Sequence, residues 1–425
     1  MTFTVTNPEL AADLHNRINI DLIVGNGFDI RVLKRLNQQP TTFSNFYDWE
    51  MKRANQNQSS IILNIMKIRK DEFEDWSDIE EAITIAVCEN KYDIKDIIQS
   101  VQQIQEDFAD FLNSIVTPEM LNLTNIIANK KSVKKSVKHL LVDDSFVEKT
   151  LYSFGDDVLM MYNEKSVNEI FGIIDHYDLM NWSIFKFNYT YLLDNYLKMA
   201  FQNFDPHMYF QSKMNSYFRI PQTRKPSDNR KQTIYSTFLH QQVFHPHGSI
   251  GIPSGMLFGY NSIDQLHGSP VPPELRYRSQ YKLEQQLAKS YLAQDEINYG
   301  PYLAEAELFI VFGSSLGRSD AWWWEHILQR LCVEFSLESL SFNAKKQDTT
   351  HAIYSPKLII YWFGPSLPAT PKENPNAYAE IRKQVLARIL AFLPSNTNAE
   401  LRKRIYKQIF VIPFGPDTKL TAFQI

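Results

Sequence analysis

The hydrophobic and polar residues of this chain follow two alternating patterns over most of its length. Short apolar runs, of the kind that form buried strands, are separated by stretches in which apolar residues recur at helical spacing. The runs that predict strands lie at 20–24, 182–190, 255–261, 307–312, 358–363 and 409–414. The stretches that predict helices lie at 28–36, 191–201, 275–292, 321–335 and 377–392. This alternation predicts an α/β fold with a mostly parallel sheet flanked by helices.

One long segment departs from the alternation. Between residues 43 and 180 strand-like patterns nearly disappear and helical spacing takes over, as where Ile94, Ile97, Ile98 and Val101 share one face. No flexible linker separates this segment from the rest. We therefore expect a single domain over residues 1–425, with a large helical insertion at 43–180.

An acidic run inside the expected insertion contains Trp76, Asp78 and Glu80. Carboxylates are favourable in the first turn of a helix because of the helix dipole, so the run predicts a solvated helix start. A tryptophan beside these carboxylates also leaves open that the run borders a functional site.

Composition argues against several classes of protein. The chain has 425 residues and a formal net charge of -4, which gives it no bulk attraction to nucleic acid. Its two cysteines, Cys88 and Cys332, are too few for a disulfide framework or a cysteine-rich metal site. The N-terminus lacks the basic and apolar blocks of a signal peptide, and no apolar run is long enough to cross a bilayer. We expect a cytoplasmic protein without a membrane partner.

The first predicted strand ends at a glycine turn, Gly25-Asn26-Gly27, and a predicted helix follows from Phe28. Glycine permits a tight turn and a close approach to a ligand, and a helix N-terminus attracts anions. A dinucleotide fingerprint needs a third glycine at position 30, where this chain has Ile30. The turn predicts a bound nucleotide phosphate without indicating a nicotinamide-dependent oxidoreductase.

Polar clusters lie at the C-terminal ends of four strand-like runs, one of which is a further run that begins at Gln242. They are Gly25–Asp29, Asn188–Thr190, His247–Ser249 and Gly313–Leu316. Each has an ordinary explanation by itself, since Asn188 could cap the next helix and His247 could be a hydrogen-bonded turn residue. The carboxyl ends of parallel strands meet at one edge of a sheet, where ligands bind. The four clusters together therefore predict one site.

Five short motifs occur in a defined order: G-N-G-F-D at 25–29, W-x-D-I-E at 76–80, F-N-Y-T at 187–190, H-G-S at 247–249 and G-x-S-L-G-x-S-D at 313–320. In this order the sequence resembles the AbiH family of phage abortive-infection proteins. The resemblance implies a role in antiviral defence. It also suggests a homo-oligomer. The macromolecular partners that it suggests are a phage-derived trigger or a partner defence protein.

The same order is similar to the wider SIR2-like group, whose Rossmann-like sheet binds NAD and whose defence members hydrolyse it. The resemblance implies an NAD glycohydrolase (NADase) with NAD as substrate, and with Asn188 and His247 as the catalytic pair. The residues implied for NAD binding are Gly25, Asn26, Gly27, Phe28, Asp29, Gly313, Ser314, Ser315 and Asp320. The first turn would hold the diphosphate, and the two serines the adenosine side.

The sequence departs from both patterns in places. The AbiH family usually has Gly-Leu-Pro-Thr soon after its first motif, whereas this chain has Asn37–Thr42. The SIR2 turn is usually followed by a serine, where Asp29 stands here. With only two cysteines, the zinc-binding quartet of deacetylating sirtuins is absent. Protein deacetylation is therefore not expected, and no metal is expected.

The implied chemistry suits these residue types. Cleavage of the N-glycosidic bond to nicotinamide needs little covalent help because the leaving group is already cationic. A neutral histidine such as His247 accepts a proton near pH 7. A carboxamide such as that of Asn188 both donates to and accepts from a ribose hydroxyl or water.

Two alternatives stay open. His245 and His247 have the spacing of a metal-dependent hydrolase, although no downstream ligand set completes it. A nucleotide-binding sensor without catalysis would use the glycine turn and Ser314–Ser315 but would not need His247. Gly313–Ser319 is one residue short of a P-loop and has Arg318 in place of the lysine, so an NTPase is excluded.

Overall fold

The structure is a computed structural model of the chain. It describes residues 17–53, 60–72, 78–89, 91–121, 146–171, 178–202, 218–219, 237–267, 279–333, 335–336 and 353–423. Trp76 of the acidic run lies outside the described residues.

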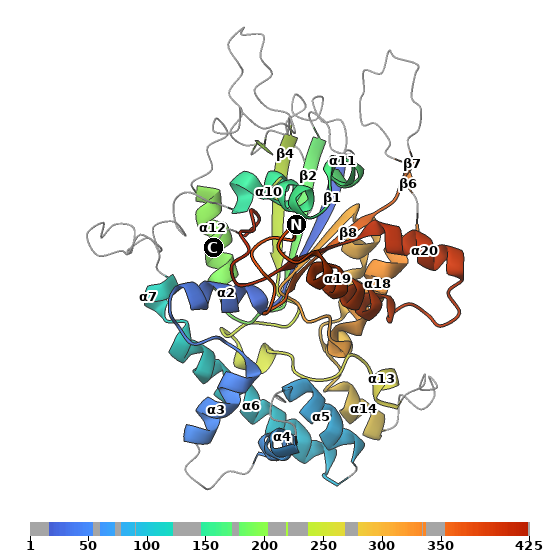
Figure 1. The fold of residues 1–425 in the computed structure, drawn as a ribbon. Coiled ribbons are helices and arrows are strands. Elements are labelled where there is room, and N and C mark those ends of the chain that lie inside the picture. The colour runs from blue at the N-terminus through green and yellow to red at the C-terminus, as the bar shows by residue number, and fades with distance from the viewer. Residues whose placement is uncertain are drawn as a thin grey trace, which may run out of the picture.

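Within the described residues, a sheet of seven strands forms the centre of the molecule (Figure 1). Its strands are β1 (Arg17–Val24), β2 (Asp178–Lys186), β3 (Phe218–Arg219), β4 (Thr237–Phe244), β5 (Leu308–Phe312), β8 (Lys357–Phe363) and β9 (Ile409–Phe414). Their order is β3-β4-β2-β1-β5-β8-β9, and every neighbouring pair is parallel. A separate antiparallel pair joins β6 (Phe335–Ser336) to β7 (Ile353–Tyr354). The predicted α/β, Rossmann-like architecture is confirmed.

Helices cover both faces of the sheet. One face carries α2 (Gly27–Arg35), α10 (Phe146–Met161) and α12 (Leu192–Gln202), and the other carries α17 (Gly300–Glu305), α18 (Ala321–Leu331), α19 (Pro375–Leu390) and α20 (Ala399–Gln408). Side chains of β1 alternate between the two cores, with Leu22 and Val24 in the first and Ile23 in the second. All three are fully buried, so β1 is a central strand.

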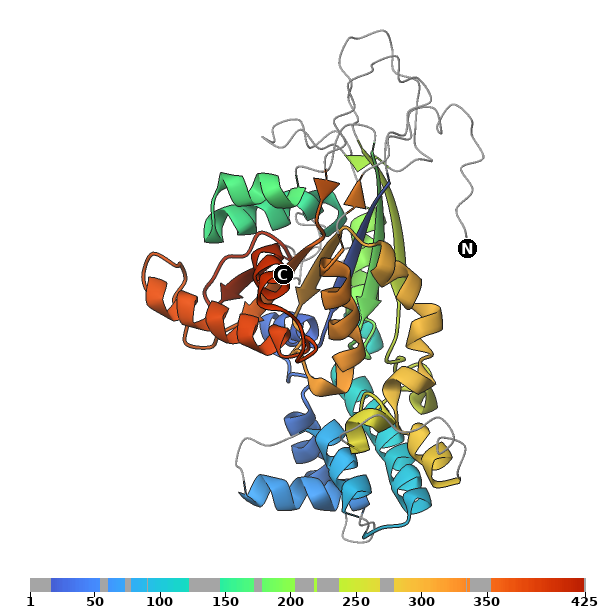
Figure 2. The ribbon, with the colours of Figure 1, turned by 90° about the vertical axis from the view of Figure 1, so that its right-hand side faces the viewer.

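The described elements between α2 and β2 are helices, and they form two groups. The first consists of α3 (Phe43–Arg53), α4 (Ile61–Glu72), α5 (Ile79–Cys88) and α6 (Ile94–Ile115), which we call the helical body; the short α7 (Pro118–Leu121) follows it. The helical body lies below the sheet in both ribbon views (Figures 1 and 2). The second group, α10 and α11 (Glu164–Phe171), lies beside the sheet, where Phe154 packs against Trp182 of β2 and Tyr361 of β8. The segment predicted as one insertion thus has two structural roles.

The helical body is joined to the loops that follow β2 and β4. The ring of Phe108 in α6 lies 5.7 Å from that of Tyr189 and 5.4 Å from that of Phe258, measured between centroids. Gln105 Nε2 donates to the carbonyl oxygen of Met256 at 2.5 Å. These contacts come from residues that are buried, so the body is packed onto this edge of the sheet.

Two predicted elements differ from the structure. Residues 255–261 form no strand; the short helices η3 (Pro253–Gly255) and α13 (Ile263–His267) flank an irregular stretch. The helix predicted at 275–292 is broken into α14 (Ser279–Gln285) and α15 (Lys289–Leu292), and α16 (Asp295–Asn298) follows. The break has a tertiary cause, because the amide of Lys289 donates to the carbonyl oxygen of Tyr260 at 2.9 Å. A hydrogen bond to a distant loop here outweighs local helical propensity.

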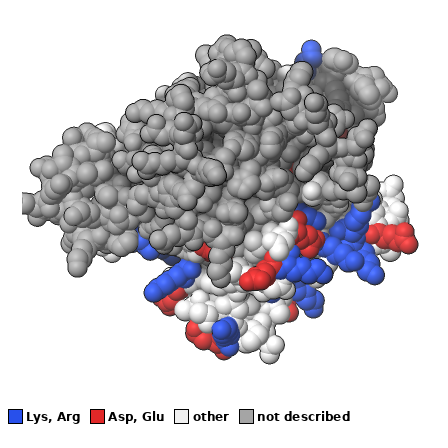
Figure 3. Space-filling model, turned by 90° about the horizontal axis from the view of Figure 1, so that it is seen from above, with Lys and Arg blue, Asp and Glu red and all other residues white. Residues whose placement is uncertain are grey.

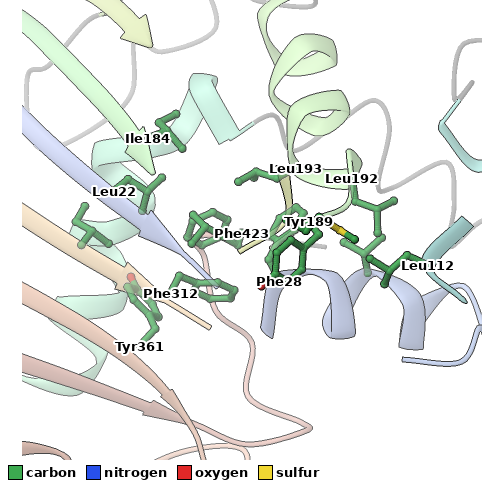
Figure 4. Packing of buried hydrophobic residues seen from close by; sticks show 14 of the residues in the cluster. Leu22, Phe28, Leu112, Ile184, Tyr189, Leu192, Leu193, Phe312, Tyr361 and Phe423 are labelled. Atoms are coloured by element: carbon green, nitrogen blue, oxygen red, sulfur yellow. The ribbon is translucent and has the colours of Figure 1, made fainter. Parts of the chain in front are cut away.

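The C-terminal segment reaches the middle of the first core. The ring of Phe423 lies 4.2 Å from Phe312 and 6.0 Å from Phe28, so it packs beside the ends of β1 and β5 (Figure 4). Buried Asp157 of α10 accepts from the amides of Thr421 and Ala422 at 2.6 and 2.9 Å. These hydrogen bonds anchor the segment that carries Phe423.

Charges on the visible described surface are mixed. Seen from above, lysine and arginine side chains lie beside aspartate and glutamate (Figure 3). No helix in the described part of the chain is both long enough and apolar enough to span a bilayer.

Candidate active site

The turns after β1 and β5 are joined backbone to backbone. The amide of Gly25 donates to the carbonyl oxygen of Phe312 at 2.8 Å, and that of Gly27 donates to the carbonyl oxygen of Gly313 at 2.9 Å. A Cβ atom at Gly25 or Gly27 would lie 2.5 Å from an atom of Gly313. Both glycines are therefore required by the contact between the two turns, and their amides are already used. Binding of a diphosphate here stays a prediction.

The polar residues of the first turn also have partners within the protein. Asn26 Nδ2 donates to the carbonyl oxygen of Thr41 at 2.6 Å, and Thr41 Oγ1 donates back to Asn26 Oδ1 at 2.9 Å. Asn26 thus fixes the loop that leads into α3. Phe28 is fully buried in the core beside Phe423. In this structure Asn26 and Phe28 hold the turn in place.

Asp29 connects the first turn to the end of β2. Its carboxylate accepts hydrogen bonds from Asn188 Nδ2 and, at 2.6 Å, from Thr190 Oγ1. Burial raises the pKa of Asp29 to about 6, although the bond from Thr190 and the charge of Lys186 act in the opposite direction. The G-N-G-F-D and F-N-Y-T motifs therefore meet through side chains.

Asn188 has one polar atom without a partner. The side chain lies at the carboxyl end of β2 and only 2% of the residue is exposed. Its amide nitrogen donates to Asp29, while its Oδ1 is buried and has no hydrogen-bond partner among the described residues. A buried carbonyl oxygen left in this condition is costly, so a donor from a ligand or water would be favourable there.

His247 lies at the end of the neighbouring strand, β4. Its ring stacks on Phe187, with 4.4 Å between centroids, and it also hydrogen-bonds to the backbone of Phe187. Its Nε2 lies 3.2 Å from Asp320 Oδ1. Burial and the nearby charge of Lys289 lower the pKa of His247, which makes the ring neutral at pH 7.

Asp320 belongs to an ion network that the sequence did not predict. Lys289 Nζ lies 2.5 Å from Asp320 Oδ1 and 2.8 Å from Glu80 Oε1. Burial would raise the pKa of Asp320, but the charge of Lys289 and the hydrogen bonds from Lys289 and His247 hold it well below its usual range. Asp320 was expected to bind NAD; in this structure it binds His247 and Lys289.

The turn after β5 gives its polar residues different surroundings. Gly313 has φ +68 and faces the first turn, and half-buried Ser314 accepts the amide of Leu316 through its Oγ at 3.3 Å. Ser315 is exposed. A role for either serine in binding adenosine stays a prediction.

A comparison with models of protein families shows which family the chain belongs to. Residues 22–338 match the family model described as "Bacteriophage abortive infection AbiH", which covers most of the chain. The chain belongs to this family. A search of curated protein sequences finds no significant match. The AbiH match includes every motif described above and ends before β8 and β9.

The acidic W-x-D-I-E motif of this AbiH protein begins a helix, as predicted, and also reaches the residues around His247; that it borders a functional site stays a prediction. Asp78 caps α5, because its Oδ1 accepts from the amides of Glu80 and Glu81 at 2.9 and 3.1 Å. Glu80 points the other way and binds Lys289, which lies beside His247 through Asp320.

The two histidines of the H-x-H segment in this AbiH chain have different partners. His245 Nε2 lies 2.9 Å from Asp194 Oδ1, and the other carboxylate oxygen of Asp194, Oδ2, binds buried Lys186. His247 instead binds Asp320. No group of three histidine, cysteine, aspartate or glutamate side chains converges as a metal site in the described part of the chain. The geometry does not favour the metal-hydrolase alternative.

Proposed function

We propose that this abortive-infection protein cleaves the N-glycosidic bond of NAD and releases nicotinamide. The observation that carries the proposal is the buried Oδ1 of Asn188 at the carboxyl edge of the sheet, which has no hydrogen-bond partner among the described residues. That atom would accept a hydrogen bond from a ribose hydroxyl or from the attacking water. Asp29 fixes the direction of the carboxamide by accepting from Nδ2.

The reaction needs a proton acceptor, and His247 has the required properties. Its lowered pKa keeps the ring neutral at pH 7, so one of its two nitrogens carries a lone pair; the base role requires this nitrogen to face the attacking water and not the backbone of Phe187. Water would bond to C1′ of the ribose, the electron pair of the broken bond would leave with nicotinamide, and the proton of water would pass to His247. Asp320 at 3.2 Å from Nε2 would stabilise the imidazolium that results.

An assay of nicotinamide release tests this proposal. Purified protein is incubated with NAD, with and without EDTA, as wild type and as Asn188→Ala and His247→Ala. We expect the His247→Ala protein to lose activity by ~10²–10⁴-fold, which is the usual contribution of a general base. His326→Ala is a matched control, because His326 in α18 binds Glu296 and the backbone of Trp322 and not the partners of His247.

A second assay covers a protein that is silent until it is triggered. NAD is measured in cells that express the wild type or His247→Ala, before and after phage infection. Depletion of NAD in wild-type cells alone supports the proposal. Protection against phage without nicotinamide release and without NAD depletion contradicts it.

A non-catalytic nucleotide sensor is the second candidate. It is favoured by one observation: the ring of His247 already binds acceptors of the protein, Asp320 and the backbone of Phe187. A sensor would bind NAD with wild-type affinity in His247→Ala and would protect against phage with that substitution. Retained protection in His247→Ala therefore separates it from the NADase.

A further inference from the structure

A buried lysine connects the helical body to His247. Lys289 begins α15 and is 3% exposed, and its Nζ binds Glu80 Oε1 at 2.8 Å and Asp320 Oδ1 at 2.5 Å. Glu80 belongs to α5 of the helical body, whereas Asp320 follows β5. Because Asp320 also contacts His247, one ammonium group links three parts of the chain that are far apart in sequence.

Both the backbone and the ammonium group of Lys289 are held by contacts within the protein. Its backbone amide donates to the carbonyl oxygen of Tyr260 at 2.9 Å, and the next residue, Ser290, donates its amide to the carbonyl oxygen of Asn261 at 3.2 Å. The side chain therefore starts from a defined point and ends between two carboxylates. Burying these charges singly would be very costly, so each holds the others in place.

We propose that Lys289 is a positioning residue that holds Asp320 against His247, and that Glu80 makes this arrangement depend on docking of the helical body. The proposal concerns the regulation of the site and rests on the function proposed above only for the role of His247 in catalysis. Lys289 acts through Asp320, so it would fix the position of Asp320 relative to His247 without contacting substrate.

The charged groups around His247 determine how a substitution at Lys289 changes the pKa of His247. Asp320 faces the ring directly, Lys289 faces it from α15 and binds Glu80, and the ring of Tyr189 lies 6.5 Å from it between centroids. Buried Asp295 interacts electrostatically with Asp320 and Lys289. The positive charge of Lys289 lowers the pKa of His247, and Asp320 raises it. Removal of the lysine charge alone would move the titration of His247 upward, whereas release of Asp320 from the ring would move it downward.

The first test reads the histidine itself in the full-length protein. The ring of His247 is followed by NMR with ¹³C-labelled histidine, and its signal is assigned from the spectrum of His247→Gln. Lys289→Met is expected to lower the midpoint of the His247 titration, because Asp320 is no longer held against the ring, and Lys289→Arg to restore it toward the wild-type value. Lys282→Met, at an exposed lysine of α14, is the matched control and is expected to leave the midpoint unchanged. A midpoint that is unchanged in folded Lys289→Met, or that rises as loss of the charge alone would make it, overturns the proposal.

The second test addresses the helical body and does not need Lys289→Met to fold. Burial raises the pKa of Glu80 to about 7, so the comparison is made at pH 8, where Glu80 is ionised. Glu80→Gln is expected to shift the His247 signal, although Glu80 is in a different helix. Glu81→Gln changes the exposed neighbouring carboxylate and is expected to leave the signal in place. A His247 signal that does not move in Glu80→Gln overturns the dependence on the helical body.

These tests distinguish failure of the Lys289 proposal from failure of the NADase proposal. Failure to detect nicotinamide release contradicts the NADase but leaves the NMR results standing. If nicotinamide is released, the acidic limb of its pH–rate profile should move in Lys289→Met in the same direction as the His247 midpoint. A fall in rate without movement of the profile would indicate a merely structural lysine and would overturn the positioning role.

Discussion

Two halves of the same sheet edge are built in different ways. On the side of β1 and β5, the turns meet through backbone atoms, with two hydrogen bonds and no room for a Cβ at Gly25 or Gly27. On the side of β2 and β4, buried side chains meet through hydrogen bonds and ion pairs around Asn188 and His247. The first half is defined by close packing and the second by buried polar groups.

The difference shows where recognition of a ligand is expected. The amides of Gly25 and Gly27 are satisfied by the chain, so the glycines are explained without a ligand. Asn188 Oδ1 is buried and unsatisfied among the described residues, and packing does not explain it. The half with side-chain networks is thus the one that needs a ligand or water to complete its hydrogen bonds.

The largest effect is expected from a change that separates the two turns. In Gly27→Ala the new Cβ would lie 2.5 Å from Gly313 Cα, which is backbone and cannot turn away. Overpacking of this kind usually costs ~1–3 kcal/mol and occasionally more. Urea unfolding should show a loss at or above the upper end of that range.

Gly300→Ala is the matched control for this comparison. Its Cβ would lie 3.5 Å from the flexible side chain of Glu296, an ordinary contact. Gly300 begins α17, so the exchange should have little effect on unfolding. Equal stability of Gly27→Ala and Gly300→Ala would contradict the backbone contact between the turns.

A smaller effect is expected where the two halves are joined by Asp29. Asp29→Ala removes the acceptor for Asn188 and Thr190, and a buried polar group left unpaired costs ~1–3 kcal/mol. Asp29→Asn keeps a carbonyl oxygen at that place and should cost less. Urea unfolding of both proteins checks the order; an equal loss in the two proteins would show that the negative charge, and not the hydrogen bonding, is required.

The stability of the fold is also expected to depend on pH. Burial raises the pKa of Asp29 to about 6 and that of Glu80 to about 7, above the ~4 of unfolded carboxyls. Between those values the folded state binds more protons, so these groups make the free energy of unfolding fall as pH rises from about 4 to about 7. His247, whose pKa is lowered, acts in the opposite direction just below its ordinary value. Urea unfolding at pH 5 and pH 8 should show this decline, and Glu80→Gln should reduce it.

Several features followed from local sequence patterns. The apolar run 20–24 and the glycine turn after it predicted the central strand and its end, since both depend on neighbouring residues. Asp78 was predicted as a helix start, and it caps α5. The meeting of Asn188 with Asp29 could be anticipated from the rule that strand ends share an edge.

Other features depend on contacts that no local pattern records. Lys289 lies in a stretch with helical spacing, where a lysine is normally solvated, and only the fold places it between Glu80 and Asp320. The interpretation of the glycines as a ligand cradle could not include the partner turn, because Gly27 and Gly313 meet only after β1 pairs with β5. The break before α15 has the same origin, a hydrogen bond to Tyr260.

The position of Phe423 has a consequence for protein synthesis. Its ring packs against Phe28 and Phe312, directly beside the residues that form the two joined turns. Because the ribosome makes the chain from the N-terminus, β1 is synthesised long before Phe423. The two turns therefore pack fully only once the chain has been made as far as Phe423.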